Sequence, residues 1–222
     1  MSIDVVLFDL DGTLADTAPD LVAVLNRQLR EHGKAPLPYA LARNVVSNGA
    51  VGLIRLGFRL APNQPVDAAL HARFLELYAQ NLCVNSRLFI MLHTLSDIYS
   101  RFGARWGIVT NKPASLTRPL ITALGLADAA TVVSGDSLPQ KKPHPAPLQL
   151  AAREAGALPE RCVYVGDAPR DIDAGHAAGM RTIAAAYGYL RPEDEPQDWG
   201  ADAHIGHPSE LMGILAAMEK QS

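Results

Sequence analysis

The sequence lacks the features that mark membrane-spanning and exported proteins. It contains no run of about 18 apolar residues, the rough minimum for a membrane-spanning helix, so neither a membrane span nor a membrane partner is expected. Its first residues, Met1-Ser2-Ile3-Asp4, include no basic segment, and therefore no signal peptide is predicted. These absences predict a soluble, non-exported protein.

Cysteine is also scarce, with only Cys83 and Cys162 among 222 residues. The two lie far apart, and Cys162 begins an apolar run in which a buried, reduced thiol is the expected state. The sequence therefore favours a cytoplasmic protein.

No block of basic residues is present. Twenty Lys and Arg face 23 Asp and Glu, and the signs are mixed along the chain, so nucleic acid is not an expected partner. A hydrophobic content of 48% in this length is enough for a full core, in one large domain or a domain with a smaller insert. A monomer and a homodimer are both compatible with this composition.

Short β-branched runs recur along the chain with helical patterns between them. Because these runs are apolar throughout, they are typical of parallel strands that helices cover on both faces. We predict an α/β fold with a Rossmann-like parallel sheet, a short last strand near 203–205 and a C-terminal helix from Ser209. The main predicted strands are 5–8, 106–109, 131–133, 163–165 and 182–185.

The region 17–85 breaks this alternation because it contains helical patterns and no convincing strand. Far more residues separate the first two predicted strands than a crossover helix needs. We therefore predict a catalytic core formed by 1–16 and 86–222, with a helical cap domain formed by 17–85. Its predicted helices cover 21–32, 39–47, 51–60 and 66–82.

Two carboxylates follow the first predicted strand in Asp9-Leu10-Asp11-Gly12-Thr13. A carboxylate such as Asp9 can act as a nucleophile that forms an acyl-phosphate. Asp11 is then placed to protonate the leaving group and to deprotonate water. Taken alone, the same residues also fit a strand-end turn that satisfies backbone groups.

Phosphate ligands and a cation are predicted near the ends of later strands. Thr110 and Asn111 follow the second strand, where a hydroxyl, an amide and free N–H groups can bind phosphate oxygens, although an isolated Thr-Asn also fits a helix cap. Lys142 directly precedes a proline, which favours an extended backbone that projects the ammonium inward. It is preferred over Lys141 as the charge that phosphoryl transfer needs, although most lysines are simply solvated.

Asp167 and Asp171 form the fourth motif. Asp167 ends an apolar strand, and Asp171 lies one helical turn later on the same face. Such oxygen-rich sites suit Mg²⁺, with Asp167 as the more direct ligand and Asp171 as a ligand that binds directly or through water. Acidic residues also occur at helix N-termini without a metal.

Together, the four motifs resemble those of the haloacid dehalogenase superfamily across nearly the whole chain. The resemblance implies that Asp9 is the nucleophile and Asp11 the acid and base. It also implies that Mg²⁺ is held by Asp9, the backbone carbonyl of Asp11 and Asp167. Dehalogenases of this superfamily lack the second aspartate, so Asp11 favours a phosphatase or a phosphomutase.

Within the superfamily, several stretches resemble phosphoglycolate phosphatases, and the last third also resembles N-acetylmuramic acid 6-phosphate phosphatases. The sequence therefore predicts a Mg²⁺-dependent phosphatase acting on a small-molecule phosphomonoester, with phosphoglycolate as the first candidate. N-acetylmuramic acid 6-phosphate hydrolysis and a sugar phosphomutase are alternatives, and a non-catalytic phosphoryl-binding module is disfavoured. These resemblances rest on 16–19, 47–50, 109–113, 141–145, 187–189 and 198–202.

Substrate recognition is expected in the cap. Asn48 and Gly49 stand at a predicted helix start, where exposed N–H groups can receive a substrate carboxylate, and Arg55 lies about one turn further along. A plain loop and a solvated arginine fit these residues equally well. Where the chain returns from the cap, Leu88 to His93 lack the glycine usual in the resembling family, so the closing motion is expected to differ.

Overall fold

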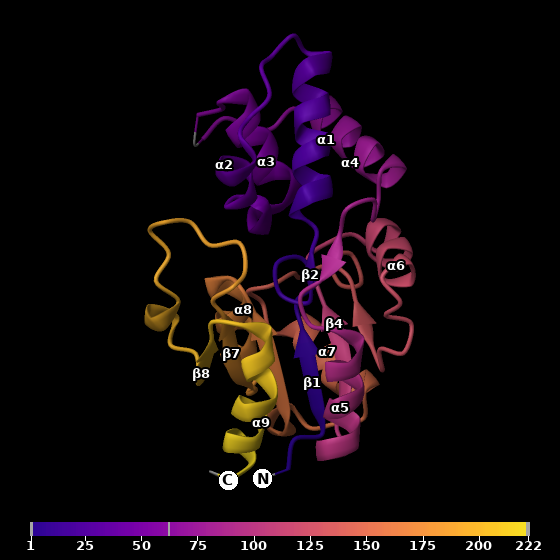
Figure 1. The fold of residues 1–222 in the computed structure, drawn as a ribbon, viewed down its shortest axis with the longest axis vertical. Coiled ribbons are helices and arrows are strands. Elements are labelled where there is room, and N and C mark those ends of the chain that lie inside the picture. The colour runs from indigo at the N-terminus through magenta and orange to yellow at the C-terminus, as the bar shows by residue number, and fades with distance from the viewer. Residues whose placement is uncertain (1, 62, 221–222) are drawn as a thin grey trace.

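The computed structural model describes residues 2–61 and 63–220 and has the α/β fold that the sequence predicts (Figure 1). Parallel strands form one six-stranded sheet in the order β5-β4-β1-β6-β7-β8. Each predicted strand is present, and β5 is one residue shorter than expected. The strands are β1 (Val5–Phe8), β4 (Arg105–Val109), β5 (Val132–Val133), β6 (Cys162–Gly166), β7 (Arg181–Ala185) and β8 (Ala203–Ile205).

The strand order places β1 at a switch point of the sheet. The chain continues from β1 to β4 and β5 on one side, and then crosses to β6, β7 and β8 on the other. In open α/β sheets, ligands bind at the carboxyl ends of the strands where the order reverses in this way. Asp9 follows β1, Thr110 follows β4 and Asp167 follows β6, so three predicted site residues meet at this edge.

Helices cover both faces of the sheet, which explains why its strands are apolar throughout. Val6 and Phe8 pack into the cluster that includes α5 and α9, whereas Val5 and Leu7 pack into the cluster with α7 and α8. All four side chains are fully buried. The helices outside 17–85 are α5 (Leu92–Phe102), α6 (Ala114–Ala123), α7 (Ala146–Glu154), α8 (Pro169–Ala177) and α9 (Leu211–Lys220).

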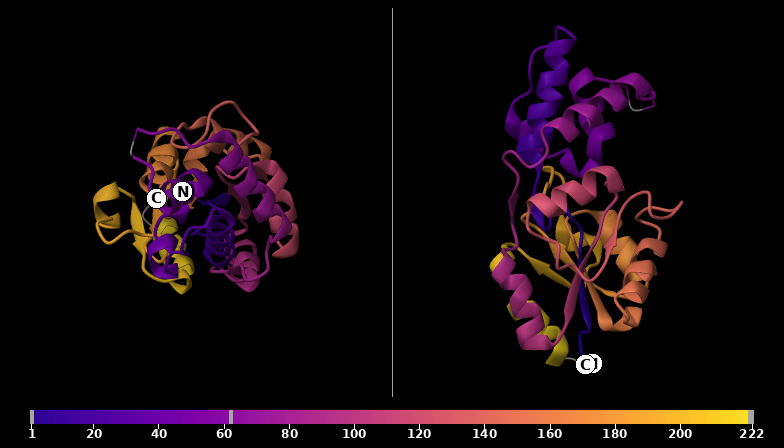
Figure 2. Two further views of the ribbon diagram at one scale, coloured as in Figure 1. Left: turned by 90° about the horizontal axis from the view of Figure 1, so that it is seen from above. Right: turned by 90° about the vertical axis from the view of Figure 1, so that its right-hand side faces the viewer.

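Four helices and one 3₁₀ turn form a separate group, called here the helical unit. They pack around their own apolar cluster, in which Leu25 and Phe74 are fully buried. Figure 1 and the right-hand view of Figure 2 show the unit standing beyond the carboxyl end of the sheet. It comprises α1 (Ala18–Glu31), α2 (Tyr39–Arg43), η1 (Val46–Asn48), α3 (Gly49–Phe58) and α4 (Ala68–Gln80).

Local sequence accounts for the start of α4 and for the break after α2. Helix α4 begins where the Asp67 side chain accepts hydrogen bonds from the N–H groups of Ala69 and Leu70, at 2.9 and 3.0 Å. The single helix predicted over 39–47 is wrong, because α2 already ends at Arg43 and the chain resumes as η1. Asparagine and paired valines at 44–46 are weak helix formers, which accounts for the break.

A short antiparallel pair joins the helical unit to the sheet. Strand β2 (Ala15–Asp16) leads into the unit and pairs with β3 (Arg87–Leu88), on which the chain returns. Neither strand was predicted, because two residues are too few to show a pattern. Ile90, just after β3, is 1% exposed and packs into the α5 and α9 cluster. The segment on which the chain returns from the helical unit therefore contributes this side chain to the core.

Three further 3₁₀ turns complete the described chain: η2 (Pro159–Arg161), η3 (Pro196–Trp199) and η4 (Pro208–Glu210). Among the helices of the described ranges, none is both long and apolar enough to span a membrane. Cys83 and Cys162 are free thiols, and Cys162 is buried as predicted.

Candidate active site

Lys142 lies directly against the predicted nucleophile. Its ammonium is 2.9 Å from Oδ1 of Asp9 and 2.8 Å from Oδ1 of Asp171, and all three residues are buried. The same ammonium donates hydrogen bonds to the Tyr164 hydroxyl at 2.6 Å and to the Val109 carbonyl at 3.0 Å. These partners direct the charge of Lys142 toward the carboxyl ends of β1 and β4, whereas the neighbouring Lys141 is exposed.

Asn111 holds the segment that carries Lys142. Its side-chain amide donates a hydrogen bond to the carbonyl oxygen of Lys142 and accepts one from the N–H of Lys142, both at 3.1 Å. The Thr110 hydroxyl accepts a hydrogen bond from the N–H of Lys112 at 3.1 Å. The Asn111 side chain is therefore engaged with the backbone of Lys142, and its role as a phosphate ligand stays a prediction.

Three buried carboxylates meet beside this lysine. Asp9, Asp167 and Asp171 each offer an oxygen, and these oxygens lie within 4.8 Å of one another. A compact set of carboxylate oxygens matches the preference of Mg²⁺ for oxygen ligands. The Asp11 side chain is not part of the set, so a contact of Asp11 with the metal would have to use its backbone carbonyl.

The electrostatics of these carboxylates also favour a cation. Burial raises the pKa of Asp167 to about 7, and the neighbouring charges of Asp9 and Asp171 add to the shift. Burial likewise raises the pKa of Asp171, although the ammonium of Lys142 opposes the change. The guanidinium of Arg170 lowers both pKa values, so three carboxylates face the two cations Lys142 and Arg170. A divalent cation would relieve the remaining repulsion.

Mg²⁺ is expected to stabilise the fold, and more so in mildly alkaline solution. The pKa of Asp167 in the folded protein, about 7, lies above its ordinary value of 3.8, so ionised Asp167 destabilises the metal-free fold increasingly as the pH rises between these values. Saturating Mg²⁺ should raise Tm by roughly 5 to 10 °C at about pH 8 and by less at about pH 5.5, where protons compete with the metal. Thermal unfolding after EDTA treatment, with Na⁺ at matched ionic strength, measures the difference. If Na⁺ raised Tm by the same amount as Mg²⁺, the proposed Mg²⁺ site would be wrong.

The predicted acid and base, Asp11, is held by a different lysine. The Lys112 ammonium lies 2.8 and 2.9 Å from the two carboxylate oxygens of Asp11, and the Thr17 hydroxyl donates to Oδ1 at 2.5 Å. Burial opposes the charge of Lys112, but Asp11 outweighs it and raises the pKa of Lys112 above its usual range. Sequence reasoning missed Lys112, although it follows Thr110-Asn111 at the same strand end.

The turn after β7 joins Asp167 to the start of the helical unit. The backbone N–H of Tyr189 donates to Oδ2 of Asp167 at 2.9 Å. The Tyr189 hydroxyl accepts hydrogen bonds from the N–H groups of Thr17 and Ala18, at 2.6 and 2.9 Å, and donates to Asp16 at 2.9 Å. No side chain of α1 itself caps its N-terminus, so Tyr189 takes that place.

A cavity of about 450 Å³ lies between the sheet edge and the helical unit. Its polar floor includes Asp9 and Asp11, and Asn48 and Gly49 line it from the helical unit. Arg55 does not line the cavity. It donates a hydrogen bond to the carbonyl oxygen of Ala61 at 2.9 Å instead, so the structure does not bring this predicted substrate residue to the site. The other lining residues are Leu21, Val46, Ser47, Ala50, Val51, His71, Phe74, Leu75, Tyr78, Thr110, Asn111, Lys112, Pro113, Leu116, Lys141 and Arg170.

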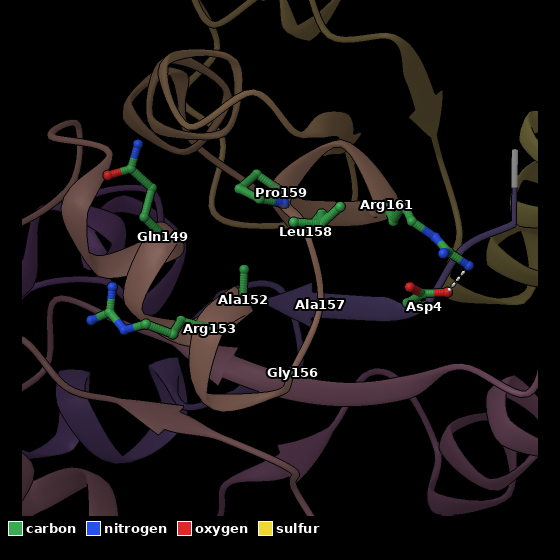
Figure 3. Close-up of a pocket in the computed structure, with 9 residues that line it drawn as sticks. All are labelled: Asp4, Gln149, Ala152, Arg153, Gly156, Ala157, Leu158, Pro159 and Arg161. Carbon is green, nitrogen blue, oxygen red and sulfur yellow. Dashed lines mark hydrogen bonds and ion pairs between the residues drawn. The ribbon is translucent and has the colours of Figure 1, made fainter.

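A second hollow, of about 490 Å³, contains none of the predicted residues (Figure 3). Arg161 and Asp4 lie on one side of it and form an ion pair at 2.6 Å, so the charge of that arginine is already compensated. Gln149 and Arg153 lie on α7 at the other side and do not converge on the pair. This hollow therefore offers no cluster of reactive groups.

Comparison with known proteins decides the family. The family model of the haloacid dehalogenase-like hydrolases matches residues 6–185 of the chain, which include the four motifs from Asp9 to Asp171. The chain belongs to this family. The resemblance of the four motifs to this family is thereby confirmed.

Individual relatives of this hydrolase carry phosphatase names. An N-acetylmuramic acid 6-phosphate phosphatase of Pseudomonas aeruginosa is 40% identical over 97% of this chain and 96% of its own. A phosphoglycolate phosphatase of Xylella fastidiosa is 42% identical over 91% of this chain and 89% of its own. The crystal structure of a predicted phosphoglycolate phosphatase from Haemophilus somnus is 27% identical, with a TM-score of 0.83 over 96% of this chain and 98% of that one. The prediction of a phosphoric monoester hydrolase is thereby confirmed.

Proposed function

We propose that this phosphatase transfers the phosphoryl group of a small phosphomonoester first to Asp9 and then to water. The observation that carries the proposal is the meeting of Asp9 and Lys142 at 2.9 Å beside the buried carboxylates of Asp167 and Asp171. An ammonium at this position opposes the negative charge that accumulates when a carboxylate attacks a phosphoryl group.

The two steps of the reaction use two carboxylates. A carboxylate oxygen of Asp9 attacks phosphorus, the bond from phosphorus to the ester oxygen breaks, and that oxygen takes a proton from the carboxyl group of Asp11. Water then attacks the same phosphorus, Asp11 takes its proton, and the bond to Asp9 breaks to release inorganic phosphate. The nucleophile and the acid/base are thus regenerated in each turnover.

We propose that the same carboxylates also form the metal site. Asp9, Asp167 and Asp171, with the backbone carbonyl of Asp11, would hold Mg²⁺. The bound ion would neutralise charge on the oxygens of the transferred phosphoryl group. Thr110 lines the cavity beside Asp9 and is proposed to contact the same oxygens.

We propose that the region 17–85 is a cap that closes over the core. The helical unit supplies one wall of the cavity, and the β2 and β3 pair carries both chain passages between the two parts. A closed cap excludes water from a reactive acyl-phosphate and contacts the leaving group. Two free thiols support the proposal that the enzyme works in the cytoplasm.

The cavity favours the larger of the two candidate substrates. Its volume of about 450 Å³ and its apolar wall, which includes Leu21, Phe74 and Leu116, suit a sugar-sized leaving group. Phosphoglycolate would leave most of this space unfilled. We therefore propose N-acetylmuramic acid 6-phosphate as the substrate. Phosphoglycolate, which the sequence motifs place first, is the second candidate because relatives about 40% identical carry its name.

A comparative panel of esters tests this choice. We expect kcat/KM for N-acetylmuramic acid 6-phosphate to exceed the values for phosphoglycolate and glucose 6-phosphate by at least about tenfold, since a filled apolar cavity contributes more than about 1 kcal/mol. Phosphate release with purified enzyme and Mg²⁺ provides the measurement. A higher kcat/KM for phosphoglycolate would reverse the assignment, and formation of a sugar bisphosphate would indicate a phosphomutase.

A further inference from the structure

The carboxylate of Asp167 is held by hydrogen bonds from three different parts of the chain. Its Oδ2 accepts one from the Ser47 hydroxyl and one from the Tyr189 N–H, both at 2.9 Å. Its Oδ1 accepts one from the Thr13 hydroxyl at 3.2 Å. Thr13 and Tyr189 belong to the core, whereas Ser47 belongs to the helical unit.

Ser47 comes from a different part of the fold than the other two partners of Asp167. It lies on η1, between α2 and α3, and is separated from Asp167 by 120 residues of sequence. Ser47 also lines the active-site cavity. A single hydroxyl therefore connects the substrate-facing wall of the helical unit to a residue of the predicted metal site.

Close packing leaves the Asp167 carboxylate little freedom to turn. A Cβ atom on Gly12 would lie 2.2 Å from Oδ2 of Asp167, and one on Gly188 would lie 2.2 Å from its Cβ. Only glycines fit on both sides. Because Oδ2 already accepts two hydrogen bonds and Oδ1 accepts one, Oδ1 keeps the lone pair that a cation requires.

We propose that Ser47 is a positioning residue through which the helical unit orients Asp167 for cation binding. The inference rests on the proposed function in one respect, namely that Asp167 binds the metal. When the helical unit moves away from the core, the Ser47 hydrogen bond is lost and the carboxylate is held less firmly. Docking of the helical unit on the core then strengthens cation binding, and cation binding favours docking by the same free energy.

The expected size of the effect follows from other metal sites. Groups that hydrogen-bond to a ligating side chain typically contribute 10- to 100-fold to metal affinity. We expect Ser47→Ala to weaken Mg²⁺ binding by about tenfold or more. Ser47→Thr keeps the hydroxyl and should retain most of the affinity.

Isothermal titration calorimetry of the full chain with Mg²⁺ alone tests the proposal without relying on turnover. Ser115→Ala, an exposed serine at the start of α6, provides a matched control that should bind Mg²⁺ like the wild type. Asp167→Asn shows whether the site exists. If Asp167→Asn binds Mg²⁺ normally, the metal site itself is wrong and the inference is overturned with it. If Asp167→Asn loses binding but Ser47→Ala does not, only the inference is wrong.

Hydrogen exchange provides the reciprocal measurement. Mg²⁺ should slow exchange in residues 39–58 of the wild type and should do so less in Ser47→Ala. A merely structural role for Ser47 would lower Tm while leaving both the Kd for Mg²⁺ and this difference in exchange unchanged. Tighter Mg²⁺ binding in Ser47→Ala would show that the hydroxyl competes with the cation, which would also overturn the proposal.

Discussion

Asp9→Asn is expected to lower kcat for Mg²⁺-dependent hydrolysis of p-nitrophenyl phosphate by on the order of 10⁴-fold or more. The asparagine side chain has nearly the same shape as aspartate, but its amide oxygen does not form an acyl-phosphate. The two-step reaction therefore cannot proceed. The fold should persist, because Lys142 keeps its ion pair with Asp171 and one of three mutually repelling carboxylates is removed. A steady-state assay together with thermal unfolding measures both effects.

The control for Asp9→Asn is Asp128→Asn, which changes an exposed carboxylate after α6. This variant should keep the wild-type kcat. Trapping of phosphate on the wild-type chain after acid quenching, and its absence in Asp9→Asn, would locate the intermediate. Wild-type turnover in Asp9→Asn would refute the mechanism.

Asp11→Asn is expected to have the second largest effect, and its size should depend on the leaving group. General acid catalysis contributes about 10² to 10⁴-fold when a poor leaving group must be protonated. An alkyl phosphate should therefore lose activity in this range. p-Nitrophenyl phosphate should lose much less in the first step, because p-nitrophenolate leaves without a proton.

A series of esters with leaving groups of increasing pKa makes this test quantitative. The slope of log kcat/KM against leaving-group pKa should become steeper in Asp11→Asn than in the wild type. Thr17→Ser is a suitable companion variant, since it keeps a hydroxyl near Oδ1 of Asp11 and should keep the wild-type slope. Equal losses for all esters would mean that Asp11 does not act as the acid.

The strand-end residues were predictable because local sequence and sheet topology together determine where they lie. An apolar run followed at once by a polar residue places Asp9, Thr110 and Asp167 at the carboxyl ends of β1, β4 and β6. The lysine before a proline was also predictable, and the structure brings it to Asp9. For the three strand-end residues the local pattern is enough, since parallel strands bring their carboxyl ends to one edge.

The contacts between elements that are distant in sequence were not predictable. Lys112 reaches Asp11 across 101 residues and Ser47 reaches Asp167 across 120, and no spacing along the chain records either approach. Arg55 shows the opposite case, since its place one turn beyond Gly49 suggested a substrate contact. Its guanidinium instead donates a hydrogen bond to the carbonyl oxygen of Ala61, three residues beyond the end of α3. Helical periodicity gives a residue's face but not what the packed unit places opposite that face.

The sequence by itself therefore determined the α/β fold, the helical region between the first two strands of the sheet, and the place of the carboxylates Asp9 and Asp167 at the strand ends. Tertiary structure alone decided which lysine holds Asp11, which residues of the helical unit line the cavity, and that Ser47 contacts the carboxylate of Asp167. The physical reason is that strand ends and helix patterns depend on neighbouring residues, whereas these contacts depend on how the helical unit packs against the sheet edge.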